Sequence, residues 1–534
     1  MTDNPPPPRP AAEPRARLVA AFRQPLDNAV AAARTCYSPR IVTPEEVAGL
    51  GESDPGRREE RRRHRDRLAR ELYQAGHHTV FEHAHFQFAL AGVSRQFVWS
   101  FLHSHPFYNS EQVSQRYVPV REGSYFVPRA LGEAASALFR ETVGAQFAAY
   151  ERLRQLLVPH VEREYFMLFP ARRRQAARYA RAIEKKAMEV ARYVLPVATC
   201  THLYHTISGL TLLRYRRICR QLDAPDEQQA VVDAMVAAVL AEFPEFGLLL
   251  EEPLAPESLP EWPFAAAAFG AGRELAVEAR REFDASLDGK ISRLVSMSAD
   301  AEGVLAQAVR EVLGVPRRAL EDAGAIGLVL DPGRNRLLGE PLNLTSMHKL
   351  GRALAHVSFT FRKRLSHTAD SQDQRHRMTP GSRPLLAAHL STAADYVVPG
   401  LIAAHPELGA PYGEAMAAAW RGIERLLACG AAPCDAAYLL PNAVPIRFTE
   451  SAPLDALWHK HRMRLCYNAQ EEIWRASVEE AQQIREAAPL IGRHLLPPCG
   501  VRRESGAAPL CPEGARYCGV RVWELALEEY RRVI

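Results

Sequence analysis

The 534-residue sequence lacks the features that mark several classes of protein. It has very few lysines, so almost all of its positive charge is arginine, and its nine cysteines are an odd number, scattered along the chain. This cysteine usage excludes a disulfide scaffold. No run of 18 or more apolar residues is present, and the N-terminus lacks the apolar core of a signal peptide. We therefore expect a cytoplasmic protein without a membrane partner.

The remaining bulk properties are those of a globular protein with more than one domain. Hydrophobic residues make up 47% and charged residues 24%, and a net charge of +5 does not indicate a nucleic-acid partner. No GxGxxG or GK[ST] phosphate motif is present. The proline-rich stretch at 251–263 is the best domain boundary. We predict a disordered tail at 1–15, domains at 16–262 and 263–490, and a cysteine-containing extension at 491–534.

The apolar pattern predicts both strands and long helices. The stretch "HTVFEHAHFQFAL" (78–90) alternates as a strand does, whereas 16–37, 133–158 and 171–194 have helical patterns. The charged run at 56–67 favours a solvated helix face over a phosphate-binding patch.

Two pairs of similar cassettes suggest an internal duplication. "SQRYVP" at 114–119 is similar to "DQRHRMTP" at 373–380, which pairs Arg116 with Arg375 at an offset of 259 residues. Stretches that begin with "LPVATC" and "LPNAVP" pair Arg214 with Arg464 at an offset of 250. Like domains fused in one chain would form a pseudo-dimer.

The polar stretch "HSHPFYNSEQVSQRYVPV" (103–120) follows an apolar run and is the strongest candidate for a binding loop. Arg116 offers a bidentate grip on a phosphate or a carbonyl edge, and Ser114 adds a further donor. Such a loop suits a nucleotide. A surface loop with satisfied turns is the alternative.

This region resembles the signature of the flavin-dependent thymidylate synthases (the ThyX family). Glu82 and His83 match an early "EH", and "SQRY" at 114–117 matches the family's "SxRY". In the second half, Arg464 is followed by four residues and "AQEEI", which matches the C-terminal family element. Arg464, Asn468 and Glu471 are expected on one helical face.

The sequence also departs from the family pattern. The Arg-His-Arg triplet reads "HSH" at 103–105 and "RKR" at 362–364. The "RHR" at 375–377 is discounted because it is taken to follow the loop. Two flavin-binding positions upstream of the C-terminal arginine read Leu203 and His205 in the first half, and Pro453 and Asp455 in the second.

The resemblance implies an α+β fold with two tandem ThyX-like domains, each an antiparallel sheet packed with long helices. It implies methylation of dUMP at C5 to give dTMP, with methylenetetrahydrofolate as carbon donor and NADPH as reductant through FAD. The alternatives are a related nucleotide such as UMP, or a degenerate non-catalytic protein that binds nucleotide or flavin.

Because each half keeps a different family element, we expect one composite site per chain, and a homodimer of fused pseudo-dimers. Arg116 and Arg464 are the catalytic candidates. The flavin candidates are His83, His103, Ser104 and His105. The substrate candidates are Glu111, Ser114, Arg116, Arg214, Arg464 and Gln470.

No metal is expected in this site. Three cysteines of the extension could bind zinc, with His494 or Cys466 as the fourth ligand, but they lack a CxxC pair. Structural thiols are the alternative. The three are Cys499, Cys511 and Cys518.

Overall fold

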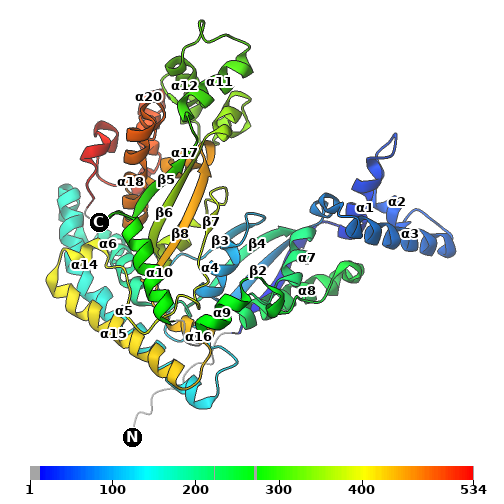
Figure 1. Cartoon of the computed structure of the whole chain (residues 1–534), viewed down its shortest axis with the longest axis horizontal. Coiled ribbons are helices and arrows are strands. Elements are labelled where there is room, and N and C mark those ends of the chain that lie inside the picture. The colour runs from blue at the N-terminus through cyan, green and yellow to red at the C-terminus, as the bar shows by residue number, and fades with distance from the viewer. Residues whose placement is uncertain (1–12, 222, 270–272, 533–534) are drawn as a thin grey trace.

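The computed structural model describes residues 13–221, 223–269 and 273–532, in which the strands form two four-stranded antiparallel sheets (Figure 1). The first sheet has the order β1-β2-β4-β3, formed by Arg15–Ala21, His85–Ser94, Cys200–Ser208 and Asn109–Gln112. The second has the order β5-β6-β8-β7, formed by Ser292–Met297, Ser358–Ser366, Pro445–Pro453 and Gly381–Ser382. The repeated order confirms the predicted fold class of two tandem α+β domains.

Helices pack around both sheets. We call residues 13–262 half one, 263–490 half two and 491–532 the C-terminal segment; these boundaries stay predictions. Half one contains α1 Pro25–Thr35, α2 Pro44–Ala48, α3 Pro55–Gln74, α4 Arg95–His103, α5 Glu133–Leu168, α6 Ala176–Ala191, α7 Gly209–Arg217, α8 Pro225–Glu242 and the start of α9 Trp262–Phe269. The helices that follow are α10 Arg273–Ser286, α11 Ala301–Leu313, α12 Asp322–Leu330, α13 His367–Asp373, α14 Gly400–Ala403, α15 Pro406–Ala428, α16 Pro433–Ala436, α17 Leu454–Arg464, α18 Glu471–Ala487, α19 Pro489–Gly492 and α20 Pro498–Ser505.

The local predictions are confirmed in part. Helices α5 and α6 occupy the predicted ranges 133–158 and 171–194, and α3 carries the charged run on a largely exposed surface. The helix expected at 16–37 is wrong in its first part, because those residues form β1 against β2 and α1 begins only at Pro25. The strand predicted at 78–90 begins at His85, after a 3₁₀ helix.

The two halves exchange backbone hydrogen bonds through their "LP" segments. The Val197 amide donates to the Leu440 carbonyl at 2.8 Å, and the Asn442 amide donates to the Leu195 carbonyl at 2.8 Å. Pro196 and Pro441 face each other in the middle of this contact, as an isolated antiparallel bridge. The reciprocal pattern relates the halves by a pseudo-twofold axis and makes them one structural unit.

A pair of buried carboxylates reinforces this junction. Glu227 on α8 accepts from the amide and hydroxyl of Ser94, both at 2.6 Å, and from the Tyr438 hydroxyl of half two at 2.7 Å. Glu472 on α18 does the same with the amide and hydroxyl of Ser366 and with the Tyr193 hydroxyl of half one, each at 2.6 Å. Ser94 also caps α4, the helix that follows β2, and Ser366 caps α13, the helix that follows β6.

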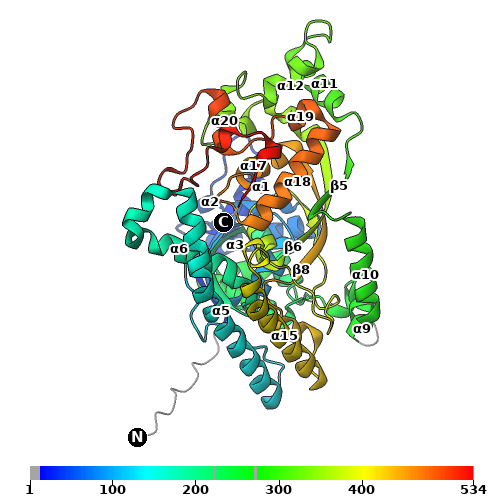
Figure 2. The same ribbon diagram turned by 90° about the vertical axis from the view of Figure 1, so that its left-hand side faces the viewer.

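Helices α5 and α15 pack side by side along the same junction (Figure 2). Gly422 of α15 permits their close approach, because a Cβ atom there would lie 2.3 Å from Cγ2 of Thr142 on α5. Thr142 is buried and its hydroxyl is bonded to the Leu138 carbonyl, so it has little room to move.

We predict that Gly422→Ala and Gly413→Ala have opposite effects on stability. Both glycines lie in α15, but a Cβ at Gly413 would meet nothing within 4 Å. Overpacking should make Gly422→Ala destabilising by about 1–3 kcal/mol, whereas better helix propensity should make Gly413→Ala stabilising by about 0.5–1 kcal/mol. Differential scanning calorimetry checks this, and equal shifts in Tm would contradict the close packing.

Candidate functional site

The binding loop of half one reaches directly into half two. Arg116 is buried, and its Nη2 donates to the Asn468 carbonyl of half two at 2.9 Å. Its Nε pairs with the Glu189 carboxylate on α6. Ser114 accepts from the Arg116 amide at 3.2 Å, which holds the loop in a tight turn. The loop after β3 and the turn after α17 therefore meet within one chain.

The Glu189 carboxylate remains charged although it is fully buried. Burial alone would raise its pKa, but Arg116, Lys186 and Arg532 together hold that pKa well below its usual range. A buried carboxylate facing several cations is a strong anchor for the Arg116 side chain.

Arg464 lies at the end of α17, on the other side of this junction. Its Nη2 donates to the Gln372 carbonyl at 2.7 Å, and burial lowers its pKa to about 10. The expectation that Arg464, Asn468 and Glu471 share one helical face is wrong. Helix α17 ends at Arg464 and α18 begins at Glu471, so a turn carries the intervening residues and exposes the Asn468 carbonyl to Arg116.

A cavity of about 450 Å³ opens beside Arg116 and Asn468. Its walls come from α6, the end of α5, the turn after α17 and the C-terminal segment, which lies near α6 in Figure 2. Among the described residues, two carboxylates line it, Glu189 and Glu513. The cations that line it are Arg116, Arg172, Arg178, Arg181, Lys185, Lys186, Arg516, Arg531 and Arg532. Aromatic rings, including those of Tyr117 and Tyr467, complete the wall, so the cavity suits an anionic ligand with a flat ring.

The structure also changes how the two halves correspond. Ser94 and Ser366, which cap equivalent helices, are 272 residues apart, so His103–His105 correspond to Arg375–Arg377. The "RHR" at 375–377 thus precedes β7 and occupies the triplet position, which corrects its dismissal. The "RKR" at 362–364 lies within β6. The pairing of Arg116 with Arg375 is wrong for the same reason.

The second-half triplet faces the loop of half one. Arg375 pairs with Glu111 at 3.1 Å, and Arg377 donates to the Asn109 side chain and to the Pro106 carbonyl, both at 2.9 Å. His376 is half-buried, and its Nε2 has no hydrogen-bond partner in the described part of the chain. Cavities of about 220 and 270 Å³ lie on either side of these residues.

The first-half triplet makes its hydrogen bonds within half one, although His103 Nε2 also lies 3.6 Å from the Asp370 carboxylate of half two. His103 Nδ1 lies 2.8 Å from the Trp99 carbonyl, Ser104 donates to the Ser100 carbonyl, and the His105 ring packs against Tyr108 and Tyr215. Burial lowers the pKa of His103 and of His105 to about 4, so both imidazoles are neutral.

The remaining predicted residues are scattered. His83 is exposed at the end of the 3₁₀ helix before β2, and Arg214 is exposed on α7 with its guanidinium 5.5 Å from the Phe107 ring. Gln470 is buried and donates to the Tyr193 hydroxyl at 2.6 Å.

The counterpart of Arg464 in half one is Cys219, because Glu227 and Glu472 are equivalent and 245 residues apart. This corrects the pairing of Arg464 with Arg214. The two flavin-binding positions of half one correspondingly read Ser208 and Leu210.

Sequence reasoning missed Arg192. It follows α6 and is buried, and its Nε and Nη2 have no hydrogen-bond partner within the described residues. Gln115 Nε2 and Gln470 Oε1, which lie at the same junction of the halves, are also unpaired there. Unpaired buried polar atoms from both halves are typical of a ligand site. The available signal was the position of Arg192, just before the first "LP" segment.

The family model for the thymidylate synthase complementing proteins matches residues 17–245 and again 293–490, one match for each sheet. The chain belongs to this family. Its relatives include the flavin-dependent thymidylate synthase of Nitratidesulfovibrio vulgaris, 28% identical over 243 residues, which cover 44% of this chain and 86% of the relative. The same enzyme of Geobacter sulfurreducens is 31% identical over 170 residues, which cover 31% of this chain and 70% of the relative.

A solved structure, the UMP/dUMP methylase PolB from Streptomyces cacaoi bound with 5-Br dUMP, is 22% identical. The match covers 45% of this chain and 94% of that chain, with a TM-score of 0.31.

None of the helices described here combines the length and apolar character needed to cross a bilayer.

In this ThyX-family chain, Cys499, Cys511, Cys518 and Cys466 are free thiols. Burial, followed by the charges of Cys466, Cys518 and Cys511, raises the pKa of Cys499 to about 12. Among the described residues, however, no three of their sulfur atoms lie within 4.8 Å of one another. Zinc binding here stays a prediction that would require the thiols to close in.

We predict that Glu227 makes the stability of this chain fall as pH rises. Burial raises its pKa from about 4.5 to about 7, so the folded chain holds a proton that the unfolded chain releases between those values. Because the folded state binds more protons, Tm should fall by a few degrees as pH rises through this window.

Glu227→Gln should flatten this part of the profile, because the glutamine amide does not titrate: its oxygen can accept from the Ser94 amide while its NH2 donates to the Ser94 and Tyr438 hydroxyl oxygens. Calorimetry at pH 5 to 8 checks it, with the exposed Glu59→Gln on α3 as the control. An unchanged profile in Glu227→Gln would count against the assignment.

Proposed function

We propose that the protein catalyses reductive C5 methylation of dUMP to dTMP, using methylenetetrahydrofolate and NADPH through FAD, at one composite site per chain. The observation that carries the proposal is the contact of Arg116 with the Asn468 carbonyl. It joins the "SQRY" loop of half one to the turn that follows Arg464 in half two.

The nucleotide is proposed to place its phosphate in the cation-lined cavity, near Arg116 and Lys186. The cavity is polar at Arg116 and Asn468 and aromatic at Tyr117, which suits a phosphate joined to a ribose and a flat base. Arg192 and Gln470 offer unpaired donor and acceptor atoms for the pyrimidine edge.

The FAD is proposed to lie along the second-half triplet. Arg375 and Arg377 can contact a pyrophosphate once they release Glu111 and Asn109, and His376 has a free ring nitrogen. These residues fit the group better than His103–His105, because two of them are arginines with a full positive charge, whereas His103 and His105 are neutral imidazoles. When bound, reduced flavin supplies the hydride for the methyl group.

The protein's own part in the reaction is electrostatic. Arg464, positively charged near a uracil carbonyl, would stabilise negative charge that develops on that oxygen and so increase the reactivity of C5 and C6. A thiol nucleophile is disfavoured here. Cys466, two residues after Arg464, has its pKa raised to about 11 by burial. Holding the nucleotide and the flavin against the "SQRY" loop also increases the rate by keeping the two reactants close together.

The pseudo-symmetric second site is proposed to be inactive. Cys219 replaces Arg464 there, and Asp223 takes the place of Asn468. Asp223 accepts a hydrogen bond from the Leu386 amide at 2.7 Å, whereas in the first site Asn468 contacts Arg116. Buried Leu386 and Leu390 line a neighbouring cavity of only about 20 Å³. A homodimeric assembly and a cytoplasmic location are further parts of the proposal, and UMP is the alternative substrate.

We predict that Arg116→Lys and Arg464→Gln each weaken dUMP binding at least about tenfold, because each loses a charge-assisted contact of about 1.5–3 kcal/mol. Calorimetric titration of the purified protein with dUMP and with UMP measures this. Arg214→Gln is the control, since Arg214 lies on the surface of α7 outside the composite site. Equal losses in all three variants would contradict the proposed site, and binding without turnover would identify a non-catalytic binding protein.

For the flavin, Arg377→Gln is expected to reduce the FAD bound to the purified protein at least about tenfold, by loss of a charged contact. Arg362→Gln is the matched control, because Arg362 belongs to the "RKR" run and is exposed on β6. The absorption spectrum after purification, with added FAD, gives the occupancy. If Arg362→Gln loses flavin and Arg377→Gln retains it, the triplet assignment is wrong.

A further inference from the structure

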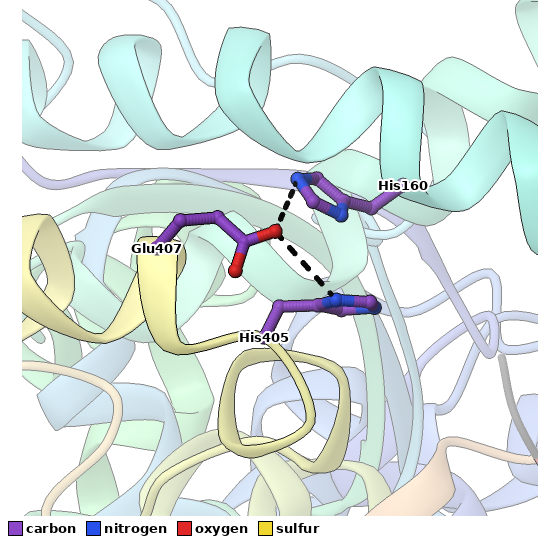
Figure 3. A group of neighbouring side chains, drawn as sticks. All are labelled: His160, His405 and Glu407. Atoms are coloured by element: carbon purple, nitrogen blue, oxygen red, sulfur yellow. Dashed lines mark ion pairs between the residues drawn. The ribbon is translucent and has the colours of Figure 1, made fainter.

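Two histidines and a glutamate converge where α5 and α15 meet, outside the proposed active site (Figure 3). His160 lies on α5, His405 immediately precedes α15, and Glu407 lies in the first turn of α15. Glu407 Oε1 is 3.7 Å from His160 Nε2 and 3.8 Å from His405 Nδ1. The three ligand atoms all lie within 4.8 Å of one another.

These distances are close to those of a metal site. Zinc bonded at about 2.0–2.1 Å to nitrogen and oxygen in a tetrahedron places neighbouring ligand atoms about 3.3 Å apart. The two distances from Glu407 Oε1, 3.7 and 3.8 Å, exceed that spacing by about half an ångström, and the third is at most 4.8 Å. The two imidazole rings already lie 4.4 Å apart between centroids.

The His160 ring is also placed to act as a ligand. Its Nε2 faces Glu407 Oε1 at 3.7 Å, and its Nδ1 is buried without a hydrogen-bond partner among the described residues.

We propose that His160, His405 and Glu407 bind a divalent transition-metal ion, with zinc as the first candidate. Imidazole and carboxylate ligands together suit zinc, and three protein ligands leave one position for water. The site joins a helix of half one to a helix of half two, so the bound ion would fix the relative position of the halves that form the composite site.

In the metal-free protein, Arg163 holds His405 in a contact that competes with metal binding. Its Nη2 lies 3.2 Å from His405 Nε2, and donation there requires the proton of His405 to sit on Nδ1, the atom that would bind the metal. Metal binding therefore needs Arg163 to turn away, which its 55% exposed side chain can do. Removing Arg163 should tighten binding, because it removes both the competing donor and a positive charge.

The test is a zinc titration of the metal-stripped full-length protein in competition with a chromophoric chelator. We expect His160→Gln and Glu407→Gln each to bind one equivalent of zinc fewer than the wild type. His64→Gln, at an exposed histidine of α3, should bind the same number as the wild type. Arg163→Gln should bind this equivalent several-fold more tightly. Because the count is compared between variants, zinc held by the C-terminal cysteines does not affect the result.

Thermal unfolding gives a second readout. Zinc in excess should raise Tm of the wild type by a few degrees and have less effect on Glu407→Gln, whose side chain is exposed and contributes little to the metal-free fold. Equal zinc stoichiometry in the wild type, His160→Gln and Glu407→Gln would overturn the proposal, as would weaker binding by Arg163→Gln.

Discussion

The structure depends on the two buried carboxylates at the pseudo-twofold junction. Glu227 and Glu472 each hold a capping serine of their own half and a tyrosine of the other half. Breaking one such buried network is costly, because the carboxylate then lacks compensation for lost hydration. This arrangement keeps the halves in one relative position, and that position brings the Arg116 loop of one half to the turn after Arg464 of the other.

Duplication allows the two halves to diverge in opposite ways. Half one keeps the "SQRY" loop but has Cys219 in the place of Arg464, and half two keeps Arg464 but has lost the loop. The second half also retains an Arg-His-Arg triplet, which Glu111 and Asn109 of the first half contact. Each functional element therefore depends on its partner from the other half, and on the junction that aligns them.

The resemblance to the ThyX family predicted the fold class, and helical periodicity, which is a local pattern, predicted two of the long helices. Sequence reasoning failed where register depends on three-dimensional pairing. The triplet at 375–377 was misplaced because short cassettes were matched by appearance, whereas the capping serines Ser94 and Ser366 set the true correspondence. Arg192 was missed because its position before the first "LP" segment, the one available signal, does not show that it is buried beside the other half. The turn after Arg464 was mistaken for helix because "AQEEI" has strong helix propensity.

The central claim, that one chain completes the site by itself, is tested most directly by co-expressing Arg116→Gln and Arg464→Gln chains with different affinity tags. Mixed dimers are purified through both tags and titrated with dUMP. If the loop and the turn join within a chain, no intact site exists in the mixed dimer and tight binding stays absent. Recovery of wild-type affinity at one site per mixed dimer would show that the site forms between chains and would contradict the account.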